Sequence, residues 1–503
     1  MQRQIFLFRQ WLCIGFFAVT TFSAFADDVP LVKRLWFEVH TEHFRIYSCG
    51  VPAQVYKVAS RLEQFCSTYS ALAGASAVAS PPIVVMVYPD HESMKPFLPI
   101  YQGQPANLAA FFQHGSDENL IVLALPGDSD AEMDMSVVFH EYTHLLLRRN
   151  DQVWPLWLKE GMAEIYSTFQ MYGYYAYIAR PIDHHLSLLA NEPMMPLSEL
   201  FSVTHDSPQY NESSRQGIFY AESWLLTDYL IAGDSQVYRA RFNNYTTLLR
   251  EGQTPVQAFT NALGAGLPQI EASLRAYLAR NQFTPIQLNL PGAIGLSAAP
   301  AVRRLTPVEN YFRLGDQLLR IGRFDTAAQF FNDGKQLAPA SPLPYEGLGL
   351  LALYQQNADE ALSQFTKSLA HNSTSFLTHY YYAWLKFQVA GETGLLSPEA
   401  GKEIHDELFK SIALMPNFGT SHELLGLLSM SQPEMHWLGE QQLQIAVRLE
   451  PENASFQLAL AQAQFENKEP DDARRTLTAL LLPTTPPKLR VQATDLMQKI
   501  ISN

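Results

Sequence analysis

The sequence predicts an α+β domain at residues 27–282, followed by an all-α solenoid at residues 307–503. Three observations support this division of the 503 residues, which are too many for one ordinary hydrophobic core. Apolar stretches of strand length and amphipathic stretches of helix length mix in the first part. Between residues 283 and 306 the composition shifts to Pro, Gly, Ala and Leu, which indicates a linker or a strap packed on the first domain. Beyond it, small and large residues recur every 34 positions, which is typical of stacked helical pairs.

The N-terminus has the features of a secretory signal. Arg3 and Arg9 precede an apolar run at residues 11–22, and Ala-Phe-Ala at residues 24–26 offers a cleavage site. The run is shorter than the about 20 residues that span a bilayer, so an uncleaved anchor is the lesser alternative. We expect residues 1–26 to be removed and the mature protein to be exported without stable membrane insertion. In a Gram-negative cell it would be periplasmic.

Charge and cysteine content narrow the partners and the redox chemistry. The formal net charge is −14, and loss of residues 1–26 removes two arginines and no acids, which makes it −16. An acidic chain without a basic stripe argues against nucleic acid and anionic membranes as partners. Cys49 is expected at a strand end and Cys66 late in the next helix, on the order of 20 Å away along it. A disulfide needs Cα atoms within about 7 Å, so we expect free, buried thiols.

The first domain begins with strands and one long helix. Residues 44–47 alternate like a strand, and residues 55–72 repeat apolar positions at helical spacing. Residues 83–88 are continuously apolar, as expected of a buried strand. Two further strands, at residues 108–112 and 120–125, flank a polar turn and predict a hairpin.

The central motif is H-E-x-x-H at residues 140–144, inside a helix predicted over residues 135–147. Residues four apart on a helix lie one above the other, so His140 and His144 face the same way. Glu141 lies about 100° round the helix and can reach a bound water without being a ligand. Two imidazoles and one carboxylate suit Zn²⁺ with a fourth position left for water. The alternative is a helix that carries two histidines by chance.

A second helix, which opens near Pro155, is expected to supply the carboxylate. Glu160 and Glu164 lie four apart and share a face, where they repel each other unless cations or a metal offset them. Trp157 and Met162 are among the apolar neighbours that argue against a solvated acidic face. We therefore expect Glu160 to bind zinc and Glu164 to hydrogen-bond and orient a ligand imidazole.

The pair H-E-x-x-H and W-L-x-E-G-x-A-E resembles the gluzincin metallopeptidases of the peptidase MA clan, and most of all the bacterial "peptidase MA-like" group. The resemblance spans residues 36–232 and is strongest over residues 137–166. It implies a zincin-like catalytic domain with Glu141 as the catalytic base and one zinc ion held by His140, His144 and Glu160.

Two further expectations come from this resemblance. The 16 positions from His144 to Glu160 are fewer than is usual in thermolysin-like enzymes, whose spacing would select Glu164. The W-L-x-E-G pattern favours Glu160. The resemblance also implies a sheet edge beside the active helix that binds an extended substrate by strand addition. Residues 120–125 are the candidate strand, and the alternative is that they are paired on both sides within the sheet.

Later residues offer a donor for the oxyanion that develops in such a reaction. Tyr220, in a helix over residues 217–226 that resembles the helix closing the cleft in this family, is the first candidate. His205, in the polar loop before it, is the second, and each could instead be structural. His184 and His185 are expected to lie in a solvated turn rather than in a second metal site.

Residues 307–503 carry tetratricopeptide units of 34 residues. Gly315 and Phe331 of the first unit recur as Gly349 and Phe365 of the second. Third and fourth units, a degenerate fifth and a capping helix over residues 488–501 follow. This arrangement predicts a concave surface for a protein or peptide partner. The alternative is a stack that only buttresses the first domain.

Together these features predict an exported zinc-dependent peptidase that acts on envelope proteins or peptides and uses its repeats to bind substrate or a partner. The sequence lacks the Gly-x-Met-Glu-Asn segment of aminopeptidases, which favours an endopeptidase. The first alternative is a catalytically weak or inactive zincin-fold scaffold whose repeats mediate protein–protein interaction in the envelope. The second is a metal-stabilised structural component. The intact Glu141 favours an enzyme, because a retired site has no need of a base.

Overall fold

The computed structural model describes most of the chain from residue 31 onwards. The described residues are 31–74, 81–101, 103–106, 108–126, 134–150, 154–211, 213–233, 236–290, 302–393, 396–481 and 485–502. The predicted signal peptide lies outside them. No helix among the described residues combines the length and apolar character needed to cross a membrane.

The first domain is built on a mixed sheet of six strands in the order β11-β1-β2-β3-β7-β6. Strands β2, β3 and β7 run parallel, whereas β6 pairs antiparallel with β7 and β1 pairs antiparallel with β2 and β11. The central β3 is apolar and buried along its whole length, which suits a strand covered on both faces. The bounds are β1 Phe37–His40, β2 Phe44–Ser48, β3 Ile83–Tyr88, β6 Ala110–Gln113, β7 Asn119–Ala124 and β11 Val302–Arg304.

The edge strand of this sheet beside α3 (Ser136–Asn150) is β6, and the opposite edge is β11, so the prediction that residues 120–125 form the edge strand is wrong. Strand β7 lies between β3 and β6, with Ile121 opposite Val85 on one side and Phe112 on the other. The hairpin itself was predicted correctly. Its second strand, β7, lies inside the sheet rather than at its edge, since its Leu, Ile and Val side chains are buried on both faces.

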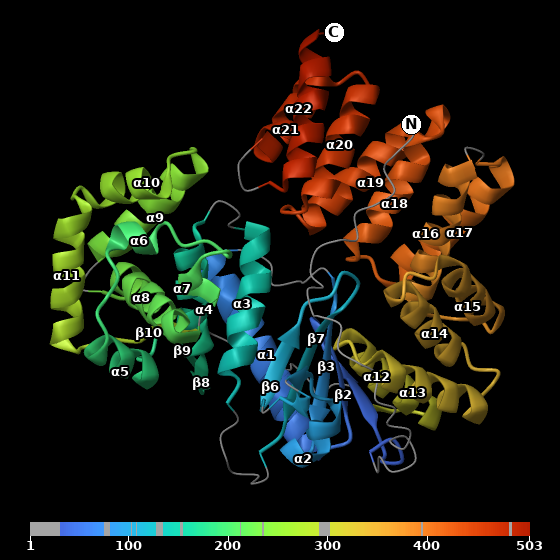
Figure 1. Ribbon diagram of the computed structural model, residues 1–503, viewed down its shortest axis with the longest axis horizontal. Coiled ribbons are helices and arrows are strands. Elements are labelled where there is room, and N and C mark those ends of the chain that lie inside the picture. Colours follow the sequence, from blue (N-terminus) through green and yellow to red (C-terminus); the bar gives the residue numbers. More distant parts are fainter. Residues whose placement is uncertain are drawn as a thin grey trace.

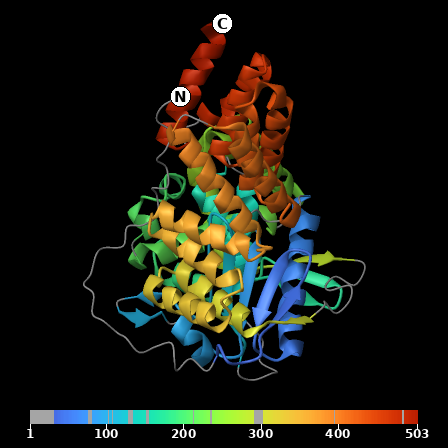
Figure 2. The ribbon, with the colours of Figure 1, turned by 90° about the vertical axis from the view of Figure 1, so that its right-hand side faces the viewer.

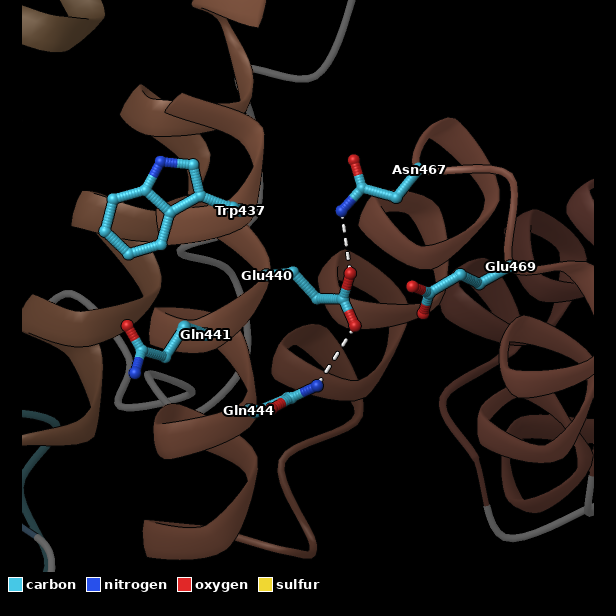
Figure 3. Close-up of a pocket in the computed structure, with 6 residues that line it drawn as sticks. All are labelled: Trp437, Glu440, Gln441, Gln444, Asn467 and Glu469. Carbon is cyan, nitrogen blue, oxygen red and sulfur yellow. Dashed lines mark hydrogen bonds between the residues drawn. The ribbon is translucent and has the colours of Figure 1, made fainter. Parts of the chain in front are cut away.

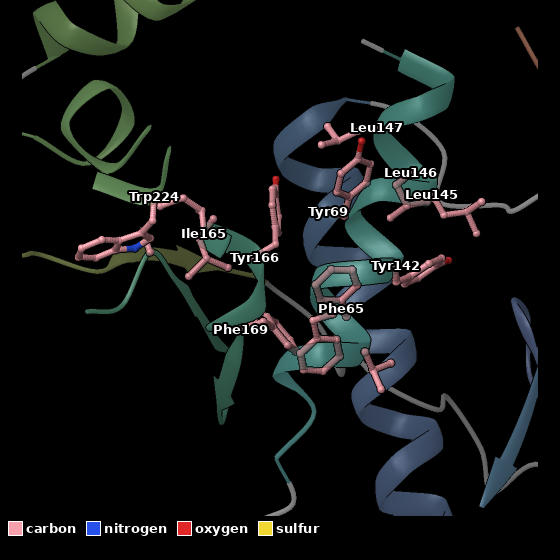
Figure 4. Close-up of a cluster of buried hydrophobic side chains, with 14 of the residues drawn as sticks. Phe65, Tyr69, Tyr142, Leu145, Leu146, Leu147, Ile165, Tyr166, Phe169 and Trp224 are labelled. Atoms are coloured by element: carbon pink, nitrogen blue, oxygen red, sulfur yellow. The ribbon is translucent and has the colours of Figure 1, made fainter. Parts of the chain in front are cut away.

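One face of the sheet is covered by α1 Pro52–Ala73 and α3 Ser136–Asn150. The rings of Phe65 on α1 and Phe139 on α3 stack with centroids 4.7 Å apart. Figure 4 shows aromatic side chains, including Tyr142, Tyr166 and Phe169, gathered around this contact. Because α3 packs into this core from Val138 to Leu147, the face that carries the H-E-x-x-H histidines has a fixed direction.

The other face of the sheet is covered by the first repeat, α12 Pro307–Arg320 and α13 Phe324–Leu337, so the two predicted domains share one hydrophobic core. Tyr88 of β3 donates a hydrogen bond to Gln317 of α12 over 2.7 Å, and Gln317 donates to the carbonyl of Phe97 over 2.9 Å. Figure 1 shows α12 and α13 beside β2 and β3. The first repeat therefore packs directly on the sheet of the first domain and is not separated from it by a free linker.

Residues 283–306, predicted to be a linker or a strap, include two paired strands. Strand β10 Ile286–Asn289 adds to a small antiparallel sheet with β8 Gln170–Tyr172 and β9 Tyr175–Ile178, and β11 adds to the main sheet. The described part of this range fits the strap.

A helical layer follows α4 Leu156–Ser167 and packs around α8 Ser213–Ile231. Gly161 allows α4 to approach α8 closely, since a Cβ there would lie 2.1 Å from Thr227 Oγ1 and 2.3 Å from the Ser223 carbonyl oxygen. The other helices of this layer are α5 Asp183–Asn191, α6 Leu197–Leu200, α7 Pro208–Asn211, α9 Gln236–Arg250, α10 Pro255–Leu263 and α11 Leu267–Arg280. Shorter elements near the sheet are α2 His91–Met94, a 3₁₀ turn at Lys95–Phe97, β4 Ile100–Tyr101 and β5 Gln104–Pro105.

The C-terminal part is the predicted helical solenoid, which rises from the sheet towards the C-terminus in Figures 1 and 2. Small residues meet large ones between its helices: a Cβ on Gly347 would lie 2.3 Å from the Phe331 ring. After the first repeat the helices are α14 Leu343–Tyr354, α15 Ala358–Ala370, α16 Phe376–Thr393, α17 Pro398–Leu414, α18 Gly419–Met430, α19 His436–Leu449, α20 Ala454–Glu466, α21 Pro470–Thr478 and α22 Pro487–Ser502, with 3₁₀ turns at Pro433–Met435 and Ala479–Leu481.

Both cysteines in the described residues are free thiols, as predicted. Cys49 is half-buried and Cys66 is buried, with its Sγ 3.3 Å from the Tyr142 hydroxyl. Burial raises the pKa of Cys49 to about 11 and raises that of Cys66 well above its usual range, so both remain protonated at neutral pH.

Candidate metal centre

Helices α3 and α4 bring His140, His144 and Glu160 together. The Nε2 atoms of the two histidines are 3.1 Å apart, and Glu160 Oε2 lies 3.1 Å from His144 Nε2 and 3.5 Å from His140 Nε2. The Glu160 side chain is 2% exposed, whereas the two imidazoles are 15% and 18% exposed and so are partly open to solvent. Three potential ligand atoms from two helices thus converge on one point.

The separations of these atoms fit a zinc ion. Bonds of about 2.0–2.2 Å arranged tetrahedrally place ligand atoms roughly 3.3 Å from one another. The three separations of 3.1, 3.1 and 3.5 Å bracket that value. The donor set of two imidazole nitrogens and one carboxylate oxygen is also the set that zinc prefers. That these three residues bind a metal is a prediction, and the distances between their atoms are compatible with it.

Glu164 lies behind the cluster and contacts the other side of the His140 ring. Its Oε1 is 3.3 Å from His140 Nδ1, whereas Glu160 faces Nε2. Of the two acids, Glu160 therefore faces the Nε2 atoms of both histidines, whereas Glu164 faces the far nitrogen of His140. A carboxylate on the far nitrogen fixes the tautomer and direction of a ligand imidazole.

His185 extends this arrangement by one residue. Its Nε2 lies 3.2 Å from Glu164 Oε2, and its side chain is 4% exposed. The prediction of a solvated turn is wrong for this residue, because it lies within α5 and is buried beside Trp224, with ring centroids 6.0 Å apart. The local sequence, two adjacent histidines shortly after a proline, does not predict which of the two side chains is buried.

The charges of the cluster are strongly coupled. Burial alone would lower the pKa of His140, but Glu160 and Glu164 raise it to about 10. Burial would raise the pKa of both acids, but the histidines around them lower each to about 2. Both carboxylates are therefore ionised at neutral pH, and the site favours a positive charge among the imidazoles.

Glu141 projects towards the edge strand rather than into the cluster. Its Oε2 lies 3.9 Å from Nε2 of His114, the residue that follows β6, and the two side chains are 36% and 33% exposed. No motif or spacing in the sequence points to His114. Since His114 lies 27 positions before Glu141, the packing of α3 beside β6 is what brings the two side chains together.

Aromatic residues form the opposite side of the site. Tyr220 of α8, the first predicted oxyanion donor, has its ring 6.1 Å from that of His140. Tyr210, to which no motif in the sequence points, donates a hydrogen bond to Glu160 Oε1 over 3.4 Å. His205, the second candidate, lies 5.1 Å from the Tyr210 ring. Burial, together with the charge of Glu160, raises the pKa of Tyr210 to about 12, so it keeps its proton as a donor.

Comparison with known proteins identifies the repeats. The tetratricopeptide repeat family matches residues 439–487, which span most of α19 to the start of α22. Comparison with curated proteins gives no match.

Similar solved structures are tetratricopeptide-repeat proteins and a pilus factor. YrrB, described as having an unusual peptide-binding site, is 15% identical, with a TM-score of 0.31 over 37% of this chain and 91% of its own. TTC0263 from Thermus thermophilus is 21% identical, with a TM-score of 0.29 over 38% and 99%. PilW, a type IV pilus biogenesis factor, is 16% identical, with a TM-score of 0.30 over 39% and 86%. Likenesses at this level carry no argument about function.

Proposed function

We propose that the protein is a zinc-dependent peptidase with a gluzincin-like site, joined to a tetratricopeptide-repeat domain that binds a protein partner. The convergence of His140, His144 and Glu160 within 3.1–3.5 Å carries this proposal. A zinc ion bound there would supply Lewis-acid activation of water and of a carbonyl oxygen. We further propose that the protein acts in the cell envelope, where the predicted signal peptide would deliver it.

The residues around this site have distinct roles in the proposal. Glu164 holds the His140 ring through Nδ1. Glu141, on the open side of α3, takes a proton from the attacking water and returns it to the leaving amine. Tyr220 or His205 donates to the developing oxyanion, and Tyr210 holds Glu160.

Strand β6 is the site proposed for an extended peptide substrate. It is one of the two terminal strands of the main sheet, it lies next to α3, and it leads directly to His114 beside Glu141. An edge strand offers backbone N–H and C=O groups that can pair with an extended chain. An extended substrate fits an endopeptidase, which must accept chain on both sides of the cut bond.

Metal content and cleavage together test the proposal. Wild-type protein should bind one zinc per chain and cleave unfolded casein. Glu141→Gln should keep the zinc and lose about 10²- to 10⁴-fold in rate, as expected when a general base is removed. Glu160→Gln should lose both zinc and cleavage. Glu199→Gln, on α6, is a matched control and should change neither. A wild-type protein without zinc, or a Glu141→Gln variant that cleaves normally, would refute the peptidase.

The second candidate is an interaction scaffold, and the match of residues 439–487 to the tetratricopeptide family favours it. Helical repeats present extended surfaces to protein partners without any catalysis. In that case the zinc site would stabilise the fold. Zinc bound at one per chain with no Glu141-dependent cleavage of casein or envelope proteins would support the scaffold over the enzyme.

A further inference from the structure

The turn of the β6–β7 hairpin is buried, although turns usually lie on the surface with their polar groups in water. Asp117 and Glu118 are each 3% exposed. The turn is also tight, since a Cβ on Gly115 would lie 2.0 Å from the carbonyl oxygen of Glu118. Buried carboxylates are costly unless they are paired. The partners of Asp117 and Glu118 therefore determine where the turn lies.

Two helices of the solenoid hold this turn. Arg320 of α12 donates to Asp117 Oδ1 over 2.6 Å and to the carbonyl oxygen of Glu118 over 3.3 Å. The hydroxyl of Tyr381, on α16, donates to Asp117 Oδ2 over 3.2 Å. Because hydrogen bonds to a charged group are short and strong, the position of the turn depends on the positions of α12 and α16.

The same turn leads to the candidate metal centre. Only Gly115 and Ser116 separate Asp117 from His114, whose Nε2 lies 3.9 Å from Glu141 Oε2. The His114 ring also contacts that of Phe112 in β6, with centroids 4.7 Å apart. Glu141 is 36% exposed, so core packing does not fix its carboxylate. The imidazole beside it therefore restricts the positions that this carboxylate can occupy.

We propose that Arg320 and Tyr381 are positioning residues, which act on Glu141 through the hairpin turn and His114. By holding the turn, the solenoid fixes how β6 lies beside α3, and with it the imidazole that restricts Glu141. The two residues thereby reach the proposed base without contact with any of the three proposed metal ligands. The catalytic part of this inference rests on the proposed peptidase, whereas the hold on β6 can be measured without catalysis.

Tyr381→Phe is the test variant, because it removes one hydroxyl and leaves the aromatic ring and Arg320 in place. Amide hydrogen exchange of the full-length protein should become about fivefold faster at residues 110–118, the effect of one lost hydrogen bond. Exchange at residues 83–88, in the central strand, should stay the same. Zinc content should also stay the same, since no proposed ligand is altered.

The catalytic part is read from kcat and KM for a quenched fluorogenic peptide from casein. Tyr381→Phe should lower kcat about two- to fivefold and leave KM unchanged, because the position of a base matters in the transition state. His114→Ala should lower kcat about tenfold, which is part of the about 10²- to 10⁴-fold that a general base supplies. Tyr381→Phe added to His114→Ala should cause no further loss, because Tyr381 acts through His114.

Two matched controls remove a hydrogen bond inside the solenoid. Tyr382→Phe removes the next hydroxyl along α16, which donates to Glu403 of α17. Asn467→Ala removes the hydrogen bond of 2.7 Å from Asn467 to Glu440, between α19 and the end of α20 (Figure 3). Neither control should change kcat or the exchange at residues 110–118.

The outcomes separate this inference from the peptidase itself. Unchanged exchange at residues 110–118 in Tyr381→Phe, an equal change in the controls, or an additive loss of kcat in the double variant would overturn the inference. A wild-type protein that binds zinc and cleaves nothing would refute the peptidase and with it the catalytic role of Tyr381. Faster exchange in Tyr381→Phe would in that case still support the hold of the solenoid on β6.

Discussion

Arg320 of α12 joins the first repeat to the turn of the β6–β7 hairpin, and its replacement by methionine should destabilise the whole protein. Its guanidinium lies 2.6 Å from Asp117, 3.3 Å from Glu118 and 3.1 Å from Asp316. The arginine is 4% exposed and the three acids are 3–5% exposed, so none is well solvated. Burial would lower the pKa of the guanidinium, but the carboxylates around it raise that pKa.

The magnitude follows from what Arg320→Met leaves behind. Glu118 keeps its ion pair with Arg45, whereas Asp117 and Asp316 lose their cation while they stay buried. Removing one partner of a buried pair costs about 3–5 kcal/mol. With a urea dependence of about 3 kcal/mol per molar, the unfolding midpoint should fall by about 1–1.7 M. The fluorescence transition in urea measures this shift.

A control variant with an exposed ion pair and a measurement at lower pH both test whether burial causes the loss of stability. Arg474→Met breaks an ion pair with Asp471 of 3.3 Å whose members are 48% and 82% exposed, and it should cost less than about 0.5 kcal/mol. Buried acids without a cation have raised pKa values in the folded state. The free energy of unfolding of Arg320→Met should therefore fall further below that of the wild type as pH rises. The deficit of Arg320→Met should therefore shrink at about pH 5. Equal costs for the two variants would refute the reasoning.

Three further predictions concern the site and its support. Gly161→Ala should lower the thermal unfolding midpoint by several degrees, because the new Cβ would lie 2.1 Å from Thr227 Oγ1 and force α4 away from α8; an unchanged midpoint would contradict this close approach. Glu164→Ala should weaken zinc binding about 10- to 100-fold, less than Glu160→Ala, as measured by competition with a chelating dye; the reverse order would exchange their roles. Burial raises the pKa of Glu222 to about 8 from a usual value of 4.5, so the free energy of unfolding should fall as pH rises between these values. Glu222→Gln should flatten this pH dependence, which urea titrations at several pH values would measure.

Local spacing in the sequence was sufficient for much of the fold and for part of the site. His140 and His144 share a face because a helix brings residues four apart together, whatever the rest of the chain does. The 34-residue repeat likewise predicts helical pairs, since each pair packs mainly on its neighbours in sequence. The hairpin at residues 110–124 follows from two apolar runs around a polar turn.

Long-range packing determined the features of the sheet edge and of the site that local sequence patterns do not predict. Strand order put β6 rather than residues 120–125 at the sheet edge, because β7 inserts between β3 and β6. The same packing brought His114, Tyr210 and His185 to the site from three separate segments. No periodicity in those segments reports on partners so distant in the chain.

By itself the sequence determined that His140 and His144 share one face of a helix and that the repeats form stacked helical pairs. Only the tertiary structure decided that Glu160 faces the ring nitrogens shared with His144 while Glu164 lies behind His140. It also decided that the first repeat closes the core of the α+β domain. The physical reason is that a helix or repeat is specified by neighbours within a few turns, whereas a site or a shared core depends on how whole elements cross.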